Sequence, residues 1–553
     1  MRIAVIAPMI QLDSYHLDLT VRLKENDREV TLDSLYQLAL RDFETEKVPW
    51  ELKHEDDIPA AGYYLTALLR KEGYMVYLSN NAGKESIKEM EAFGPDIVCI
   101  STTMIVSILT IREIVRQIRN LMPDVFIIAG GVFIWKNFLA YQGMHYDTIK
   151  DLEDYNLFHS RNSSMGIDAY VAAPHGRDSL LRLLEEFKKG RMAFYEQIPN
   201  LILARPPGFY HTIREEENID FDNDFIHWEY IDKMPLRIPL RTSIGCPYRC
   251  RFCDFCVLYP GIFLRSSESL QKEISMIRAK LGQQIAVIHI TDDNIFINQK
   301  RLDEICNLFG QQDDFHWIAF MRASSIKESN VDAIKRSGLL MAFLGVESGD
   351  RGQLRRMRKS LQLHEQKRGI ELLDNAGISI LMSLLIGFPG ENKETIRNTA
   401  DFINSLDLRQ MVTTYQMFPM NIFPLSDLGN PEFRKKFSLT GNDREWSHAT
   451  MTGKEAPSYG YDLFRQVEAV PYHYYDESHF FNRGVFTLEE RINLFRLRHD
   501  LTINCIEKQS RQKKTSLIQE MLKVMGFDPL LVTDEVADMF YVKEQAHFKI
   551  IRK

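Results

Sequence analysis

Apolar runs, each long enough for one buried strand, alternate with amphipathic helical stretches along the first two hundred residues. The apolar runs cover residues 2–9, 74–79, 96–101, 124–131 and 168–174. The helical stretches cover residues 59–73, 84–94, 106–123 and 177–190. Continuous apolar strands that alternate with helices are typical of parallel sheets covered on both faces, so residues 1–200 are predicted to form a doubly wound, Rossmann-like α/β domain. A charged insertion from Leu12 to about Asp57 interrupts the first crossover.

The alternation stops between residues 201 and 236 and then resumes. The stretch at 201–236 contains "RPPGF" and the acidic "REEENIDFDND", which are typical of a linker. Six further strand runs lie at 237–245, 285–291, 316–323, 339–346, 378–387 and 410–418, and helical stretches separate them. Six strands with five helices predict a partial (β/α)6 barrel of the TIM type over residues 237–420. Residues 421–553 are predicted to form a mostly helical region that begins with aromatic-rich loops.

Composition narrows the class of protein and of partner. The chain has 553 residues, 45% hydrophobic and 26% charged, which is typical of globular proteins and too long for one core. A net charge of −8 argues against nucleic acid or an anionic membrane as the main partner. No apolar run approaches the roughly 20 residues of a membrane span, and the N-terminal run lacks signal-peptide features. We therefore expect a cytoplasmic protein, in which clustered cysteines bind metal rather than form disulfides.

Four of the seven cysteines lie within "GCPYRCRFCDFC", residues 245–256. Cys246, Cys250 and Cys253 have the spacing Cys-x3-Cys-x2-Cys, so their thiolates can all face one soft metal centre. Three thiolates can hold three irons of a [4Fe–4S] cluster and leave the fourth iron open. Zinc normally takes four ligands, and Cys256 leaves a four-thiolate or zinc site as the alternative. The three isolated cysteines, Cys99, Cys306 and Cys505, are predicted to be buried thiols.

The cysteine spacing, with the aromatic Phe252 before the last cysteine, resembles the signature of the radical S-adenosylmethionine (radical SAM) enzymes. The resemblance implies that Cys246, Cys250 and Cys253 hold a [4Fe–4S] cluster whose open iron chelates S-adenosylmethionine (SAM). It also implies an external one-electron reductant, such as flavodoxin or ferredoxin. Reductive cleavage of the bound SAM would then give a 5′-deoxyadenosyl radical that takes hydrogen from a substrate.

Further motifs at the strand ends of the predicted barrel follow the order found in that family. They are "HITDDNIF" with Asp292 and Asp293, "FMRAS" with Arg322, "GVESG" with Glu347 and "LIGFPGE" with Gly387. Barrel sites are built from the C-terminal ends of the strands. The resemblance implies that the carboxylates receive the ammonium or ribose of SAM and that Arg322 receives its carboxylate. Gly387 would let the backbone approach the adenine.

A doubly wound domain ahead of such a barrel is similar to the cobalamin-binding radical SAM enzymes, and the similarity covers about residues 1–420. The run "DIPAAGYYLTALLRKEGYMVYL" resembles the first helix and second strand of their cobalamin domain. Ligands lie across the C-terminal strand ends of such sheets. The resemblance implies that Ser101, Thr103, Gly130 and Gly131 bind the corrin amides and the nucleotide tail. The Asp-x-His-x-x-Gly motif of classical cobalamin proteins is absent, because His16 has the wrong spacing, so no axial histidine is predicted.

The function implied by the resemblance is a cobalamin-dependent radical SAM methyltransferase. It would take hydrogen from an unactivated carbon and transfer methyl from methylcobalamin, on a natural-product, other small-molecule or peptide substrate. A non-methylating cyclisation or rearrangement with the same cofactors is the alternative. A non-catalytic iron–sulfur or zinc sensor is disfavoured, because a sensor has no use for the ordered barrel motifs. A methylthiotransferase is disfavoured too, since it would need a second cysteine triad in a domain that contains only Cys99.

Overall fold

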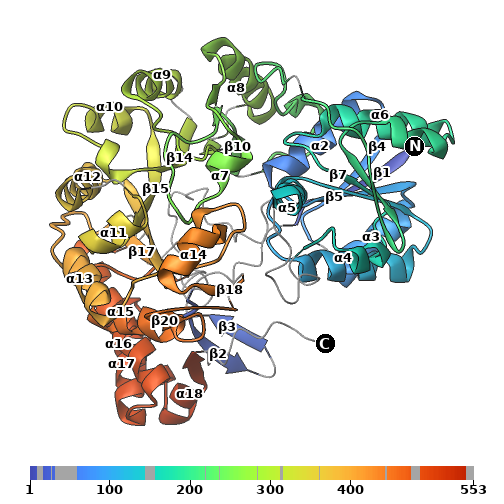
Figure 1. Cartoon of the computed structure of the whole chain (residues 1–553). Helices are drawn as coiled ribbons and strands as arrows, with labels where there is room; N and C mark the ends of the chain where they lie inside the picture. Colours follow the sequence, from blue (N-terminus) through green and yellow to red (C-terminus); the bar gives the residue numbers. More distant parts are fainter. Residues whose placement is uncertain are drawn as a thin grey trace.

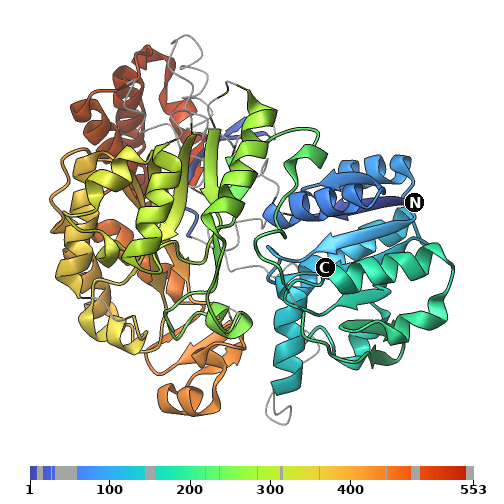
Figure 2. The same ribbon diagram turned by 90° about the horizontal axis from the view of Figure 1, so that it is seen from above.

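The computed structural model shows two α/β units side by side, with a smaller region packed against the second unit (Figure 1). A view from above separates the first unit, blue to teal, from the second, green to orange (Figure 2). The structure describes residues 1–8, 17–25, 28–31, 59–81, 83–143, 156–217, 219–235, 237–282, 284, 286–311, 315–359, 362–442, 445–474 and 486–542. No helix in this described part is long and apolar enough to cross a membrane.

The first unit is a seven-stranded sheet in the order β4-β1-β5-β6-β7-β8-β9. The strands are β1 (Arg2–Ile6), β4 (Met75–Ser79), β5 (Ile97–Ser101), β6 (Phe126–Gly130), β7 (Ala169–Val171), β8 (Leu201–Arg205) and β9 (Gly208–His211). Pairing is parallel from β4 to β7, and Ile3 of β1 faces Val76 on one side and Ile97 on the other. The strand order therefore reverses at β1, as in the predicted doubly wound domain, and the point of reversal is where such folds bind ligands.

Helices among the described residues cover both faces of this sheet. They are α2 (Ala60–Lys71) and α6 (Arg177–Lys188) on one face, and α3 (Lys84–Phe93), α4 (Ile108–Leu121) and α5 (Val132–Gly143) on the other. In α4, Ile111, Val115 and Ile118 recur at helical spacing and are fully buried toward the strands. Because both faces of the sheet are buried, each of its parallel strands is a continuous apolar run in the sequence.

The linker predicted over residues 201–236 is wrong in its first part. β8 and β9 form an antiparallel hairpin that extends the first sheet, with Leu201 paired to Val171 and Ile202 to His211. Leu201 and Leu203 are buried in the core of this unit. The proline- and glycine-rich run is the turn of the hairpin, and turn residues of this kind are also typical of linkers. The connection between the two units is therefore shorter than predicted and begins after His211.

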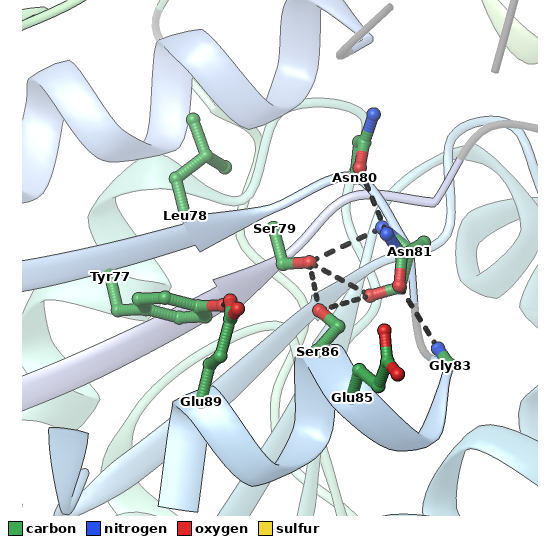
Figure 3. Close-up of a pocket in the computed structure, with 9 residues that line it drawn as sticks. All are labelled: Tyr77, Leu78, Ser79, Asn80, Asn81, Gly83, Glu85, Ser86 and Glu89. Carbon is green, nitrogen blue, oxygen red and sulfur yellow. Dashed lines mark hydrogen bonds between the residues drawn. The ribbon is translucent and has the colours of Figure 1, made fainter. Parts of the chain in front are cut away.

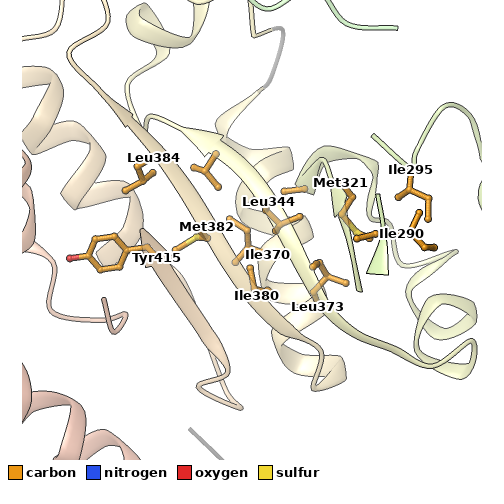
Figure 4. Packing of buried hydrophobic residues seen from close by; sticks show 14 of the residues in the cluster. Ile290, Ile295, Met321, Leu344, Ile370, Leu373, Ile380, Met382, Leu384 and Tyr415 are labelled. Atoms are coloured by element: carbon orange, nitrogen blue, oxygen red, sulfur yellow. The ribbon is translucent and has the colours of Figure 1, made fainter. Parts of the chain in front are cut away.

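The second unit is a sheet of six parallel strands in the order β10-β13-β14-β15-β16-β17, as the predicted partial barrel requires. The strands are β10 (Arg237–Leu240), β13 (Ala286–Ile290), β14 (Phe315–Met321), β15 (Leu339–Glu347), β16 (Ser379–Ile386) and β17 (Thr413–Pro419). The helices between them are α8 (Ser267–Leu281), α9 (Gln299–Gly310), α10 (Val331–Arg336), α11 (Arg351–Arg356), α12 (Leu363–Ala376) and α13 (Lys393–Asn404). Figure 4 shows Ile380 and Met382 of β16 packed with Ile370 and Leu373 of α12 in one buried cluster.

The C-terminal region combines helices with short strands. Its helices are α14 (Pro431–Phe437), α15 (Ala456–Gln466), α16 (Leu488–Glu507), α17 (Arg511–Val524) and α18 (Asp534–Asp538). A small antiparallel sheet of β18 (Thr440–Asn442), β19 (Glu445–His448) and β20 (Met451–Thr452) stands among them. The predicted mostly helical character is confirmed. Part of the aromatic-rich segment, including Tyr475, Phe480 and Phe481, lies outside the described residues.

The described part of the predicted insertion at 12–57 leaves the first unit and joins the other two regions. The amide of Leu17 donates to the carbonyl of Met417 in β17 at 3.2 Å. Strand β2 (Val21–Glu25) pairs antiparallel with β3 (Arg28–Thr31) and with β21 (Phe540–Val542) near the end of the chain. The described part of the insertion thus contacts β17 at the outer edge of the barrel sheet, next to residues 471–473, which pair with Tyr415 of the same strand. Asp13 and His16 lie outside the described residues.

Candidate active site

The cysteine loop begins at a hairpin that the sequence did not predict. Strand β10 ends at Leu240, and β11 (Ser243–Ile244) turns away to pair antiparallel with β12 (Phe263–Leu264). Gly245 has a φ of 93°, and a side chain there would collide with the carbonyl oxygen of Gly261. Only glycine fits this close crossing of two backbone segments. The loop that carries the three predicted ligands therefore starts from a fixed backbone position.

Cys246, Cys250 and Cys253 are brought together by this loop. Each is partly buried, and burial raises the pKa of each thiol. Negative charge on Cys246 and Cys250 raises the pKa of Cys253 further, so the three sulfurs lie within electrostatic range of one another. Such thiols stay protonated at neutral pH and become ligands when a metal displaces their protons.

The number of thiolates around each metal ion separates the two kinds of metal centre that the cysteine loop could hold. Zinc gathers four ligand atoms around one centre, whereas each iron of a [4Fe–4S] cluster takes one thiolate from the protein. Cys256, in α7 (Phe255–Leu258), also raises the pKa of Cys250 and so lies near the loop. The three-cysteine assignment stays a prediction that substitution can test.

Asp292 and Asp293, at the end of β13, hold the base of the cysteine loop. The carboxylate of Asp292 accepts hydrogen bonds from the amide and hydroxyl of Thr242 at 2.7 and 2.5 Å and from the hydroxyl of Ser243 at 2.6 Å. Asp293 accepts a hydrogen bond from the amide of Gly245 at 2.9 Å, and burial raises the pKa of its carboxyl. Both side chains therefore hold the backbone at the start of the cysteine loop in place. Their contact with SAM stays a prediction.

Asp292→Ala is expected to destabilise the barrel. The substitution leaves one buried amide and two hydroxyls without their acceptor, and we expect a loss of about 3 kcal/mol because each such group costs about 1–3 kcal/mol when it finds no other partner. Urea unfolding followed by circular dichroism measures the loss. Asp124→Ala, which removes an exposed carboxylate from the first unit, serves as control. Equal stability of the two variants would contradict the assigned role.

Arg322 follows β14 and faces the cysteine loop. Its side chain is 7% exposed, and its guanidinium carbon lies 3.6 Å from the centroid of the Tyr248 ring. Its positive charge lowers the pKa of Cys246 and Cys250 against the larger effect of burial. The Nε and Nη2 atoms are buried and have no hydrogen-bond partner among the described residues. A buried guanidinium without an acceptor is costly, so this position suits an anionic ligand such as a carboxylate.

Glu347 ends β15 in an unusual conformation and forms an ion pair that the sequence did not predict. Its φ is 66°, and the register of the sheet shifts between Gly345 and Glu347. Lys359 Nζ lies 2.5 Å from Glu347 Oε1, and both side chains are largely buried. A side chain at Gly345 would put its Cβ 2.7 Å from Lys359 Nζ, so glycine leaves room for the pair. The charge of Lys359 also lowers the pKa of Cys250, which places the ion pair beside the cysteine loop.

Gly387 is held in a turn by the C-terminal region. It has a φ of 96°, and a side chain there would collide with Trp446. His448 Nε2 lies 2.9 Å from the carbonyl oxygen of Gly387, and the rings of Trp446 and His448 stack at 5.2 Å. Phe252 meets the ring of Phe388, the next residue, edge to face at 6.5 Å. The structure thus brings Phe252 close to the Gly387 turn, and the contact of this turn with the adenine of SAM stays a prediction.

Glu391, at the end of the same turn, gives the barrel a pH-dependent stability. Its carboxylate accepts a hydrogen bond from the amide of Gly387, and complete burial raises the pKa of Glu391 from 4.5 to about 8. Between these two pH values the folded chain holds a proton that the unfolded chain releases. The protonated carboxyl therefore stabilises the fold fully below pH 4.5, and this contribution is lost as the pH rises through 8.

We expect the unfolding free energy of the wild-type protein to fall by about 3 kcal/mol more between pH 5.5 and pH 8.5 than that of Glu391→Gln, which has no proton to lose. Chemical denaturation at the two pH values measures the difference. Glu394→Gln, an exposed position on the following helix, should behave like the wild type. Parallel pH profiles for the wild type and Glu391→Gln would refute the assignment.

The predicted corrin-binding residues meet at the ends of β5 and β6. The hydroxyl of Ser101 lies 3.3 Å from that of Thr103. The amide and the hydroxyl of Thr102 both donate to the carbonyl of Gly130, at 2.7 and 2.8 Å. Gly131 has a φ of 109°, and a Cβ there would lie 3.1 Å from the amides of Thr102 and Thr103. All four predicted residues therefore form one tight edge of hydroxyls and bare backbone beside the reversal of strand order.

An open pocket of about 570 Å³ lies at the end of β4, on the other side of β1 from this edge (Figure 3). It is lined by Tyr77, Leu78, Ser79, Asn80, Asn81, Gly83, Glu85, Ser86 and Glu89. The hydroxyls of Ser79 and Ser86 lie 2.5 Å apart, and Asn81 accepts a hydrogen bond from the amide of Gly83 at 3.1 Å. These residues were not predicted from the sequence, although the polar run "SNNAG" after the second strand was a signal for a site.

Helix α7, directly after the cysteine loop, packs against the first unit. Leu258 is 1% exposed and belongs to the apolar core of that unit, and its carbonyl accepts a hydrogen bond from Trp135 Nε1 at 3.4 Å. Lys136 Nζ lies 2.7 Å from Asp254 Oδ2 in a largely buried ion pair. Figure 1 shows α7 between the barrel strands and α5. The cysteine loop and the sheet edge with Gly131 therefore adjoin one interface, which no local sequence pattern indicated.

Two domain families match separate parts of the chain. Residues 240–403 match the Radical SAM superfamily, and residues 55–152 match the B12 binding domain. Anaerobic magnesium-protoporphyrin IX monomethyl ester cyclase of Cereibacter sphaeroides is 24% identical over 62% of this chain and 55% of its own length. An uncharacterised methyltransferase of Pyrococcus horikoshii is 24% identical over 62% of this chain and 72% of its own length. Hopanoid C-3 methylase of Methylococcus capsulatus is 21% identical over 57% of this chain and 58% of its own length. This chain thus spans little more than half of the cyclase and of the hopanoid methylase.

Two solved structures share the fold. The radical SAM methyltransferase TsrM from Kitasatospora setae, with cobalamin and a [4Fe–4S] cluster bound, is 20% identical with a TM-score of 0.51, over 69% of this chain and 72% of that one. The cobalamin-dependent radical SAM enzyme OxsB, with aqua-cobalamin and SAM bound, is 16% identical with a TM-score of 0.51, over 96% of this chain and 72% of that one. This chain combines a B12 binding domain with a Radical SAM domain in this order, and these are the two domains of the cobalamin-binding radical SAM enzymes, whose cofactors are a [4Fe–4S] cluster, SAM and cobalamin.

Proposed function

We propose that this protein is a methyltransferase that replaces a hydrogen on an unactivated carbon of a natural-product or peptide substrate with a methyl group. When bound, the cluster and SAM supply the 5′-deoxyadenosyl radical, and cobalamin supplies the methyl group. The observation that carries the proposal is the docking of α7 on α5 through Leu258 and the Lys136–Asp254 ion pair. It supports a reaction in which both cofactor sites face the same substrate.

The reaction balances with two molecules of SAM. For each methyl group transferred, one SAM leaves as S-adenosylhomocysteine. The second SAM leaves as methionine and 5′-deoxyadenosine, which carries the hydrogen taken from the substrate. An external reductant of the flavodoxin or ferredoxin class supplies two electrons per turnover.

Three features of the barrel suit this chemistry. The Nε and Nη2 atoms of Arg322, which have no hydrogen-bond partner among the described residues, can receive the carboxylate of SAM. Lys359 holds Glu347 in place and partly offsets its negative charge beside the cysteine loop. The rings of Phe320 and Phe343 stack at 4.8 Å on neighbouring strands, and Phe320 remains 47% exposed. These rings offer an apolar wall, which helps to keep water away from a reactive radical.

A non-methylating cyclisation or rearrangement is the second candidate. The cyclase of Cereibacter sphaeroides is as similar to this chain as the Pyrococcus methyltransferase is, at 24% identity. The products distinguish the two candidates, because only methyl transfer releases S-adenosylhomocysteine.

Cofactor content and products test the proposal together. The protein is purified without oxygen, with cobalamin supplied, and is expected to contain about four iron, four sulfide and one cobalt per chain. Incubation with SAM, a reductant and candidate substrates should then release S-adenosylhomocysteine and 5′-deoxyadenosine in step with methylated product. 5′-Deoxyadenosine with an altered but unmethylated product would favour the second candidate. Iron without cobalt would refute the cobalamin role, and zinc alone would refute radical chemistry.

A further inference from the structure

The ion pair between Lys136 and Asp254 lies between the two predicted cofactor sites. A few hydrogen bonds and covalent bonds connect it to each of them. On the cobalamin side, the amide of Trp135 donates to the carbonyl of Gly131 at 3.0 Å, which fixes the first turn of α5 to the predicted corrin edge. On the barrel side, Asp254 follows Cys253 in the chain, and its carbonyl accepts a hydrogen bond from the amide of Leu258 at 3.0 Å. A shift of the backbone at Gly131 can therefore be transmitted through Trp135, Lys136 and Asp254 to Cys253.

The pair is shielded from water. The side chains of Lys136 and Asp254 are 15% and 4% exposed, and the Lys136 ammonium also lies 4.2 Å from the centroid of the Phe423 ring. A charge pair at such a site holds a defined geometry, since breaking it leaves an uncompensated buried charge. In contrast, the Glu113–Arg116 pair on α4 of the same domain has side chains that are 50% and 60% exposed, where salt and water screen the interaction.

On the basis of the proposed function, we propose that Lys136 and Asp254 are positioning residues that couple the two cofactor sites. SAM bound at the open iron would order the cysteine loop and with it Asp254. Asp254 would hold Lys136 and the first turn of α5 in place. The strand-end edge that contains Gly130 and Gly131 would then be preorganised for cobalamin. SAM then increases the affinity for cobalamin, and by thermodynamic linkage cobalamin increases the affinity for SAM by the same factor.

The coupling is measured as the ratio of two dissociation constants for hydroxocobalamin, the value without SAM divided by the value with SAM. Hydroxocobalamin is titrated by absorbance into full-length protein with a reconstituted cluster, with and without SAM and in the absence of reductant. We expect SAM to lower the dissociation constant of the wild-type protein by about fivefold or more. The double variant Lys136→Met/Asp254→Asn removes both charges and leaves neither unpaired. Its ratio should fall below about twofold, with unchanged iron content. Arg116→Met, which breaks the exposed pair on α4, should keep the wild-type ratio.

Each outcome bears on the inference separately from the proposed function. A wild-type protein that binds the cluster and cobalamin but shows no SAM effect overturns the coupling and leaves the function standing. The same holds if the double variant keeps the wild-type ratio. A wild-type protein that binds no cobalamin overturns both. If the double variant loses its iron, Lys136→Gln, which keeps an N–H donor for Asp254, provides the test, and its ratio should be less than half that of the wild type.

Discussion

Cys250→Ala is expected to lose nearly all of its iron and acid-labile sulfide, whereas Cys256→Ala should keep wild-type amounts of both. Cys250 is the middle thiol of the predicted ligand set, and Cys256 lies beyond it in α7. An iron that loses its only protein thiolate is no longer anchored, and the remaining two ligands do not retain a [4Fe–4S] cluster. Iron and sulfide per chain after anaerobic reconstitution are the measurement.

Two further results would change this assignment. Equal loss of iron in the Cys250 and Cys256 variants would show a four-thiolate site with no open iron, which is incompatible with SAM binding at the cluster. Retention of iron in both would place the cluster elsewhere. Cys306→Ala, a buried thiol on α9 outside the loop, is the matched control for loss of a cysteine as such and should retain the cluster.

Arg322→Met is expected to weaken the binding of SAM about 100-fold, because removal of one partner from a buried charged contact costs about 2–5 kcal/mol. Methionine keeps an unbranched apolar side chain but removes the buried guanidinium, which lies over the Tyr248 ring. Equilibrium dialysis with labelled SAM, on protein of equal iron content, measures the effect. Arg336→Met, on the exposed side of α10, should leave the affinity unchanged. A change below about threefold would instead assign Arg322 to packing against Tyr248.

The parts of the site that short-range patterns encode could be predicted from the sequence. Three cysteines within eight positions must lie on one loop, and residues that directly follow buried strands must lie at the strand ends of the sheet. Arg322 and Gly131 were predicted to lie at strand ends in this way, and they directly follow β14 and β6 in the structure. The residues that contact these strand ends could not be predicted from the sequence. Lys359 is one of 68 Lys and Arg residues, and its contact with Glu347 depends on the tertiary fold and on the room that Gly345 leaves for the pair.

One misread segment and one contact that was not predicted show a similar limit. The run from Leu201 to His211 has the turn residues of a linker, and its strand character depends on the edge of β7 that it covers. Lys136 and Asp254 lie on different domains, so their pairing depends on how two folded units dock. Local composition cannot predict a contact that forms only when distant segments of the chain pack together.

The pairing of β2 with β21 sets an order of events during synthesis of the chain. Val21–Glu25 emerges from the ribosome early, but its partner Phe540–Val542 is made about 500 residues later, which takes roughly half a minute to two minutes at about 5–20 residues per second. Until then β2 has only β3, and an isolated two-stranded hairpin is marginally stable in water. The two large units can therefore fold before this small sheet is complete. Until β21 has been made, β2 leaves one strand edge unpaired, and an unpaired strand edge is a template for aggregation.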